Sequence, residues 1–115
     1  MNADALRGHI EALLMSVLEH DHLHGYAISE ALRERSGGAL NVPTGTLYPA
    51  LRRLERVGRL TSEWTTAGGR RRRTYRLTPA GRIALARERA AWQEFAGAVG
   101  GVLESHARRR RDGAG

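Results

Sequence analysis

The sequence predicts a mainly α-helical fold with one small β-hairpin, and three observations support this fold class. Leu47, Leu51 and Leu54 recur at i, i+4 and i+7, the spacing of one inward face of a helix. Residues 60–77 contain two alternating stretches separated by a glycine pair, which is typical of two strands joined by a tight turn. Thr78 is followed by proline and opens a further helical segment. A short helix followed by a hairpin is the layout of a winged helix-turn-helix.

The first two helices are expected over residues 5–19 and 25–35. Six apolar residues follow a helical rhythm in the first segment. The His-Asp-His-Leu-His segment at 20–24 interrupts that rhythm and is predicted to be a turn. Ser36-Gly37-Gly38 is expected to end the second helix, because glycine accepts the left-handed conformation of a helix terminus.

The third helix and the hairpin are expected to follow directly. The third helix is predicted over residues 44–57, with Gly58 as its left-handed cap. Leu60 begins the alternation of the first strand, residues 67–69 form the turn, and residues 74–77 form the return strand.

The fourth helix is expected to run from residue 78 to about residue 104. We therefore predict a winged-helix domain over 5–77, a dimerisation helix over 78–105 and a disordered basic tail over 106–115.

The net charge of +7 is unevenly distributed. Residues 1–51 contain three Arg and six acidic residues, whereas residues 52–89 contain twelve Arg and three acidic residues, a net charge of +9. A basic block of this kind is the footprint expected of a polyanionic partner, and duplex DNA is the partner that the winged layout favours.

Composition also excludes several classes of protein. The chain has no cysteine, which excludes disulfides and thiolate metal sites. No apolar run is long enough to span a membrane, and no secretory signal is evident, so we expect a cytoplasmic protein without a membrane partner. The histidines at 20, 22 and 24 are interpreted as a polar turn, with no metal and no cofactor. No catalytic motif supports an enzyme.

Four segments resemble the PadR family of transcriptional regulators. They are Leu-Arg-Gly-His-Ile-Glu-Ala-Leu-Leu-Met near the start, His-Gly-Tyr-Ala-Ile, Gly-Thr-Leu-Tyr-Pro-Ala-Leu-Arg-Arg-Leu-Glu, and Arg-Thr-Tyr-Arg-Leu-Thr-Pro-Ala-Gly. The resemblance covers residues 6–95 and is closest to the short members with one C-terminal helix. It implies a homodimer that binds a palindromic operator in double-stranded DNA, represses transcription and is released by a small effector.

Carried over residue by residue, the resemblance gives a set of expected DNA contacts. Tyr48 offers its hydroxyl to a phosphate, and Thr44 and Thr46 meet a phosphate or a thymine methyl. Arg52 either reads a base or remains a phosphate contact or a solvated charge, and Tyr26 either meets a phosphate or packs in the core. The full expected set is Tyr26, Thr44, Thr46, Tyr48, Pro49, Arg52, Arg70, Arg71, Arg72 and Arg73.

The fourth helix is expected to carry the dimer interface. Its apolar seam comprises Leu85, Trp92, Phe95, Val99 and Val102. In short members of the family that bind flat aromatic drugs, a tryptophan on this helix lines a pore between subunits. Trp92 stands at the matching place, so it either packs the interface or contacts an aromatic effector.

Two rival functions remain open at the level of sequence. One is an RNA-binding or architectural protein that uses the basic surface without sequence preference. The other is a ligand-binding or protein-interaction module that kept the winged fold without operator binding. Selective, salt-resistant binding to DNA would separate a regulator from the first, and loss of all affinity for duplex DNA would favour the second.

Overall fold

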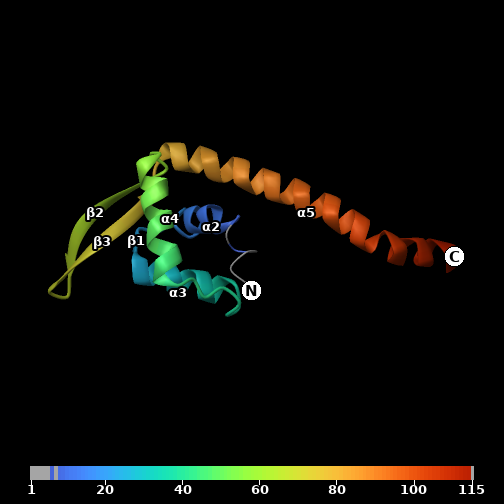
Figure 1. Cartoon of the computed structure of the whole chain (residues 1–115), viewed down its shortest axis with the longest axis horizontal. Coiled ribbons are helices and arrows are strands. Elements are labelled where there is room, and N and C mark those ends of the chain that lie inside the picture. Colours follow the sequence, from blue (N-terminus) through green and yellow to red (C-terminus); the bar gives the residue numbers. More distant parts are fainter. Residues whose placement is uncertain (1–5, 7, 115) are drawn as a thin grey trace. The chain divides into compact units, whose positions relative to one another are not determined.

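The computed structural model describes residue 6 and residues 8–114, with side chains as far as residue 104. The elements follow the order α2 (Ile10–Val17), β1 (Leu23–His24), α3 (Gly25–Arg35), α4 (Thr44–Arg56), β2 (Leu60–Ala67), β3 (Arg70–Leu77) and α5 (Pro79–Ala114) (Figure 1). The chain forms two compact units, the first ending at Leu85 and the second beginning at Ala86. The boundary between them therefore lies within α5.

The second and third helices lie where the sequence predicts them. α3 spans Gly25–Arg35, and after Ser36 come two glycines, Gly37 and Gly38, whose φ angles are 63° and 88°. α4 ends one residue before the predicted limit, and Gly58 follows with a φ of 79°. A left-handed residue of this kind lets the chain leave a helix, which is why glycine at these positions is an informative signal.

The start of the chain differs from its prediction. Leu6 is helical as predicted, but α2 spans only Ile10–Val17, because Gly8 and His9 form a turn in which the His9 amide donates to the Leu6 carbonyl at 2.9 Å. Glycine disfavours a helix interior by about 1 kcal/mol relative to alanine, which favours a break there. Residues 5 and 7 of the predicted helix lie outside the described residues.

The sheet has three strands in the order β1-β3-β2, all antiparallel, where the sequence predicted only a hairpin. Residues 23–24, predicted to belong to a turn, instead form β1, in which Leu23 pairs with Tyr75 and His24 with Thr74. A strand of two residues has no periodicity of its own, and its hydrogen bonds come from a partner about fifty residues away in the sequence. The turn prediction for these two residues is therefore wrong.

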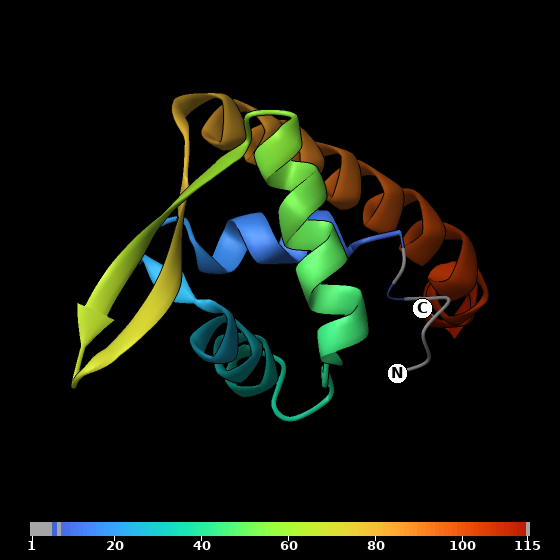
Figure 2. The ribbon, with the colours of Figure 1, turned by 60° about the vertical axis from the view of Figure 1, so that its left-hand side comes forward.

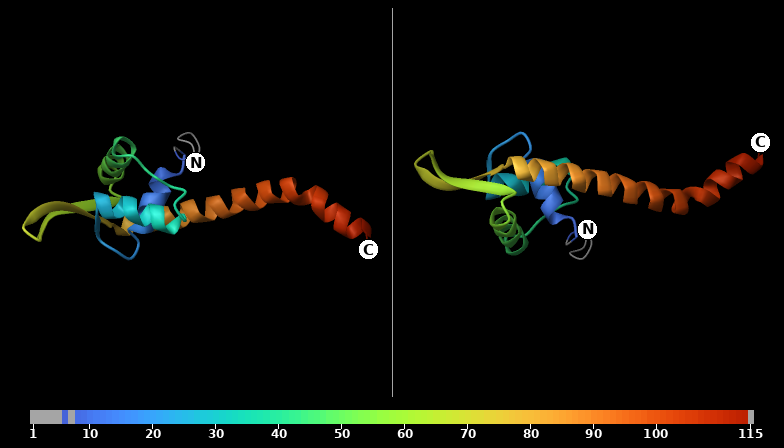
Figure 3. Two further views of the ribbon diagram at one scale, coloured as in Figure 1. Left: turned by 90° about the horizontal axis from the view of Figure 1, so that it is seen from below. Right: turned by 90° about the horizontal axis from the view of Figure 1, so that it is seen from above.

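The hairpin is longer than predicted. Gly68 and Gly69, with φ angles of 57° and 77°, form a two-residue turn in which both residues have positive φ, the geometry that suits the twist of paired strands. Ala67 is consequently the last residue of β2 and not part of the turn, and β3 begins at Arg70 instead of residue 74. The turn lies at the end of the strands opposite to the pair Leu60 and Leu77, and in Figure 3 it projects beyond the helices of the first unit.

One apolar cluster holds the first unit together, and in Figure 2 α4 crosses in front of α2 within it. Leu14, Ile28, Leu51 and Leu54 are completely buried in this cluster. Full burial of such a side chain contributes about 1.5–3 kcal/mol. These four residues are at inward positions of the predicted helices, so the apolar periodicity correctly identified the core faces.

α5 begins where the sequence predicts. The Thr78 hydroxyl accepts a hydrogen bond from the Gly81 amide at 3.0 Å, which caps the first turn. The helix continues to Ala114, beyond the expected end near residue 104 and through the segment that was expected to be disordered. Alanine and arginine, which make up residues 107–111, both favour helix. Residue 115 lies outside the described residues.

Candidate nucleic-acid interface

The outer face of α4 presents polar side chains at helical spacing. Thr44, Tyr48 and Arg52 are exposed, whereas Leu47 and Leu51 between them are buried in the core. Thr46 and Pro49 are half-buried. α4 runs through Pro49 without a break. The core thus fixes which face of α4 is free, and three of the five residues expected to contact DNA from this helix lie fully on that face.

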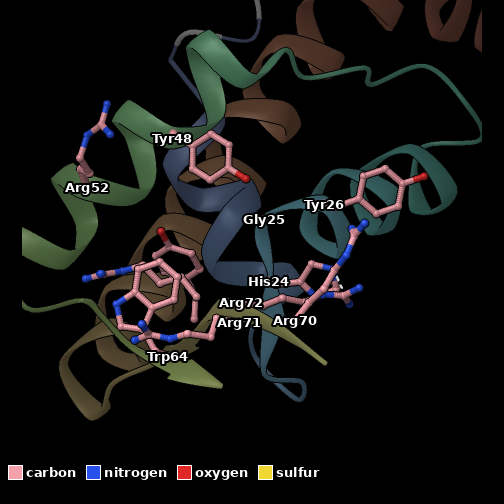
Figure 4. A pocket seen from close by; sticks show the side chains of 11 residues that line it. His24, Gly25, Tyr26, Tyr48, Arg52, Trp64, Arg70, Arg71 and Arg72 are labelled. Carbon is pink, nitrogen blue, oxygen red and sulfur yellow. Dashed lines mark hydrogen bonds between the residues drawn. The ribbon is translucent and has the colours of Figure 1, made fainter. Parts of the chain in front are cut away.

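Tyr48 also lies against the start of α3. A Cβ atom built at Gly25 would overlap the Tyr48 hydroxyl and would stand 2.8 Å from Cζ and 2.9 Å from Cε1 of that ring. Figure 4 shows the Tyr48 hydroxyl directed toward Gly25. His24, the residue before the helix, makes no side-chain cap. The backbone amides in the first turn of a helix have no partner within the helix. The Tyr48 hydroxyl therefore lies beside free amide donors at the start of α3, and together they form one polar surface.

Tyr26 lies beside the Tyr48 hydroxyl and the start of α3, and it is 70% exposed. The sequence left open whether Tyr26 packs in the core or meets a ligand. Its exposure excludes the core alternative, because a core aromatic ring would be almost fully covered. The ring lies on the surface of α3, among residues that line the same cavity as Tyr48.

The four consecutive arginines lie on β3 and not in a turn, so their side chains alternate between the faces of the hairpin. Arg71 and Arg73 share a face with Trp64, and their guanidinium carbons lie 5.0 and 5.7 Å from the centre of its ring. Arg70 and Arg72 belong to the opposite face. One nitrogen of Arg72 lies 3.4 Å from Nε2 of His24 in β1 (Figure 4).

Ion pairing distinguishes these arginines further. Arg73 is paired with Glu55 at 3.1 Å, and Arg53 on α4 is paired with Glu11 at 3.2 Å. Within the part of the chain whose side chains are described, no carboxylate pairs with Arg52 or with Arg70, Arg71 and Arg72. Four guanidinium groups on α4 and the hairpin thus keep their positive charge unneutralised.

These groups line one open cavity of about 790 Å³. Its lining residues, shown in Figure 4, are His24, Gly25, Tyr26, Tyr48, Arg52, Trp64, Arg70, Arg71, Arg72, Arg73 and Tyr75. Seven of the ten residues expected to contact DNA are therefore brought together. Thr44, Thr46 and Pro49 lie on α4 outside the lining.

Four lining residues were not foreseen as part of the site: His24, Gly25, Trp64 and Tyr75. Strand alternation predicts which face of the hairpin Trp64 occupies, but only the register of β2 against β3 shows that Trp64 pairs with Arg73. Tyr75 was expected to face inward and is 4% exposed. Burial raises the pKa of its hydroxyl above the ordinary value of 10.0, and the nearby Arg73 charge opposes this shift.

The apolar residues of α5 that were expected to form a dimer seam differ in exposure. Trp92, Phe95 and Val102 are 53%, 60% and 75% exposed, and the rings of Trp92 and Phe95 lie 6.3 Å apart. Leu85 is only 2% exposed and belongs to the core of the first unit. Assigning Leu85 to the seam is therefore corrected: heptad spacing alone does not show that the first turns of α5 pack into the core.

The described part of the chain contains neither a metal-binding cluster nor a membrane-spanning helix. Across residues whose side chains are described, no group of three or more His, Cys, Asp or Glu is arranged to hold a metal ion. Among those same residues, no helix is long and apolar enough to cross a membrane.

The helices α2, α3 and α4, together with a three-stranded sheet whose long hairpin carries a run of arginines, define a basic winged helix-turn-helix protein. Residues 14–87 match the model of the transcriptional regulator PadR-like family. The chain therefore belongs to the PadR-like family of transcriptional regulators.

Individual relatives agree with this assignment. The chain is 43% identical over 88 residues to the transcriptional regulator Rv3488 of Mycobacterium tuberculosis, covering 74% of this chain and 79% of that protein. It is 35% identical to a PadR family transcriptional regulator from Eggerthella lenta, with a TM-score of 0.77 over 88% of this chain and 87% of the other. It also resembles Bacillus subtilis PadR in complex with operator DNA, at 26% identity and a TM-score of 0.61, covering 67% of this chain and 44% of that one.

Proposed function

We propose that this regulator is a sequence-specific DNA-binding protein, acts as a homodimer on a palindromic operator, and represses transcription until a small effector releases it. The observation that carries the proposal is the convergence of Arg52, Arg70, Arg71 and Arg72, none paired with a described acid, on one open cavity. Charge of this kind, close to exposed aromatic and hydroxyl groups, suits a DNA backbone. The solved complex of Bacillus subtilis PadR with operator DNA supports the same partner.

In the proposed complex, α4 enters the major groove. Arg52 is the long side chain best suited to a bidentate contact with guanine, and Thr44 and Thr46 contact a phosphate or a thymine methyl. Tyr48 donates its hydroxyl to a phosphate beside the start of α3, where Tyr26 is also exposed. Pro49, which is half-buried within α4, is the remaining proposed contact of this helix.

The hairpin is proposed to lie along the backbone of the duplex. Arg70, Arg71 and Arg72 are its candidates for phosphate or minor-groove contact. Their charge accounts for a sequence-independent share of the affinity, which should weaken as salt rises. Selectivity must then come from α4, because phosphate contacts carry no base information.

Dimerisation is proposed to use the second unit. Trp92, Phe95, Val99 and Val102 are large apolar side chains that a single chain leaves exposed, and burying them against a second copy would remove that surface from water. Trp92 is also the candidate contact for an aromatic effector. A cytoplasmic location follows from the proposed role on DNA.

Fluorescence anisotropy with labelled duplexes tests the proposal. The purified protein should bind DNA from upstream of its own gene much more tightly than a scrambled duplex of equal length, by about 10³-fold or more for a specific regulator. Equal affinity for both duplexes, lost together as salt rises, would instead identify a non-specific nucleic-acid-binding protein. Absence of affinity for either duplex, and for a wider operator library, would favour an interaction module.

A further inference from the structure

We infer that Arg73 is a positioning residue that anchors the hairpin to α4 through Glu55, and that the DNA contacts of the wing belong to its other arginines. This inference rests on the proposed DNA-binding function. In the sequence, residues 70–73 are one run of four arginines. The inference gives Arg73 a positioning role and leaves DNA contact to the other three.

The guanidinium group of Arg73 contacts three residues: Glu55, Ser62 and Trp64. Nη2 donates to Oε2 of Glu55 on α4 at 3.1 Å, and Nε donates to Oγ of Ser62 on β2 at 2.8 Å. The guanidinium carbon also lies 5.7 Å from the centre of the Trp64 ring. One side chain on β3 therefore joins α4, β2 and an exposed aromatic ring, and it commits two of its five N–H donors to the first two of these contacts.

Arg71 offers the internal contrast. It lies on the same face of the hairpin and closer to the Trp64 ring, at 5.0 Å, yet no described carboxylate pairs with it. Its five donors remain available to an anion. The difference follows from register, because Arg73 stands opposite Trp64 and within reach of Glu55, whereas Arg71 stands two residues nearer the turn.

This arrangement also explains an acidic residue in a strongly basic surface. Glu55 is the only acid within α4, and a carboxylate close to bound DNA would repel phosphates. Paired with Arg73, it instead sets the distance between the wing and α4, the two elements proposed to contact one duplex. A wing held in place before binding loses less conformational entropy when the complex forms.

Glu55→Gln provides a test that depends on the sign of the effect. If Arg73 acts through Glu55, the variant should bind operator less tightly, by up to about fivefold per subunit, the value of an exposed ion pair. If Arg73 contacts phosphate, removing the negative charge should strengthen binding. That increase would overturn the inference.

Arg73→Lys and Arg71→Ala complete the comparison. Lysine keeps the charge but lacks the planar fork that bonds Glu55 and Ser62 together, so Arg73→Lys should bind operator as weakly as Arg73→Ala. Arg71→Ala should lower the slope of log affinity against log salt by about 0.9 per subunit, whereas Arg73→Ala should leave the slope unchanged. Full rescue by lysine, or an equal fall in slope for Arg73→Ala, would also overturn the inference.

A measurement without DNA separates this inference from the proposed function. In a Trp92→Phe background, Trp64 is the one remaining tryptophan. Glu55→Gln and Arg73→Lys should increase quenching of its fluorescence by acrylamide, because one of the two guanidinium groups over the ring is released or removed while that of Arg71 stays in place. Glu11→Gln, which breaks the ion pair to Arg53 on the other side of α4, is the matched control and should leave quenching unchanged. Unchanged quenching in the two wing variants would refute the anchor, whereas failure of the unmutated protein to bind DNA would refute only the proposed function.

Discussion

Gly25→Ala is expected to weaken DNA binding while leaving the fold intact, because the new Cβ atom displaces Tyr48. Ordinary van der Waals contact begins at 3.4 Å, whereas this Cβ would stand 2.8 Å from Tyr48 Cζ, so the ring must withdraw by about 0.6 Å and its hydroxyl by more. The Tyr48 side chain is 38% exposed and can turn outward into solvent. Alanine also has up to about 1 kcal/mol better helix propensity than glycine, so we expect stability to change by less than that amount.

The effect on binding should be larger. A hydrogen bond to a charged group contributes about 1.5–3 kcal/mol, and its loss would lower affinity about ten- to a hundredfold per subunit. Anisotropy with operator and scrambled duplexes measures the loss, which should be similar for both if Tyr48 meets only phosphate. Tyr48→Phe should reproduce it, and Gly25→Ala should add nothing further in that background.

Gly81→Ala is the matched control for a clash with backbone. A Cβ there would overlap the Arg59 carbonyl oxygen and stand 2.6 Å from Leu77 Cδ1, and neither neighbour can turn into solvent. Overpacking of this kind costs about 1–3 kcal/mol, so Gly81→Ala should lower the melting temperature without changing affinity while the protein is folded. The reasoning fails if Gly25→Ala binds DNA as tightly as the unmutated protein while Tyr48→Phe does not.

Three further predictions address other parts of the molecule. Arg52→Ala should cost about 1–3 kcal/mol of discrimination between operator and scrambled DNA, and equal weakening of both in a competition assay would move Arg52 to the phosphate contacts. If the Trp92 ring is only an interface residue, Trp92→Ala should release monomers in sedimentation, since truncating a buried tryptophan costs about 3–5 kcal/mol. If the ring lines an open pore instead, the Trp92→Ala dimer should survive. Planar aromatic compounds should then quench the fluorescence of Trp92 in a Trp64→Phe background. Burial raises the pKa of the Tyr75 hydroxyl in the folded protein. The contribution of Tyr75 to stability is therefore fully present below its ordinary pKa of 10.0 and is lost as pH rises through the pKa of the folded state. Chemical denaturation above pH 10 should show this loss in the unmutated protein and not in Tyr75→Phe.

The sequence by itself determined the local elements of this protein. α3 and α4 were predicted almost to the residue, because apolar spacing marks their inward faces and glycines end them. The glycine pair located the turn of the hairpin, and the charge distribution marked the basic side of the molecule. Apolar spacing and glycine positions depend on residues close together in the sequence, so they can be recognised without knowing the fold.

The tertiary structure decided everything that depends on partners distant in sequence. β1 exists because Leu23 and His24 meet β3, and Leu85 is buried because the start of α5 packs into the core. The contact of Tyr48 in α4 with Gly25 in α3 likewise joins two separate elements. The same is true of the ion pair between Arg73 in β3 and Glu55 in α4. Four adjacent arginines carry the same charge in the sequence, but only strand register and long-range packing determine which of them is neutralised and which remain free to meet an anion.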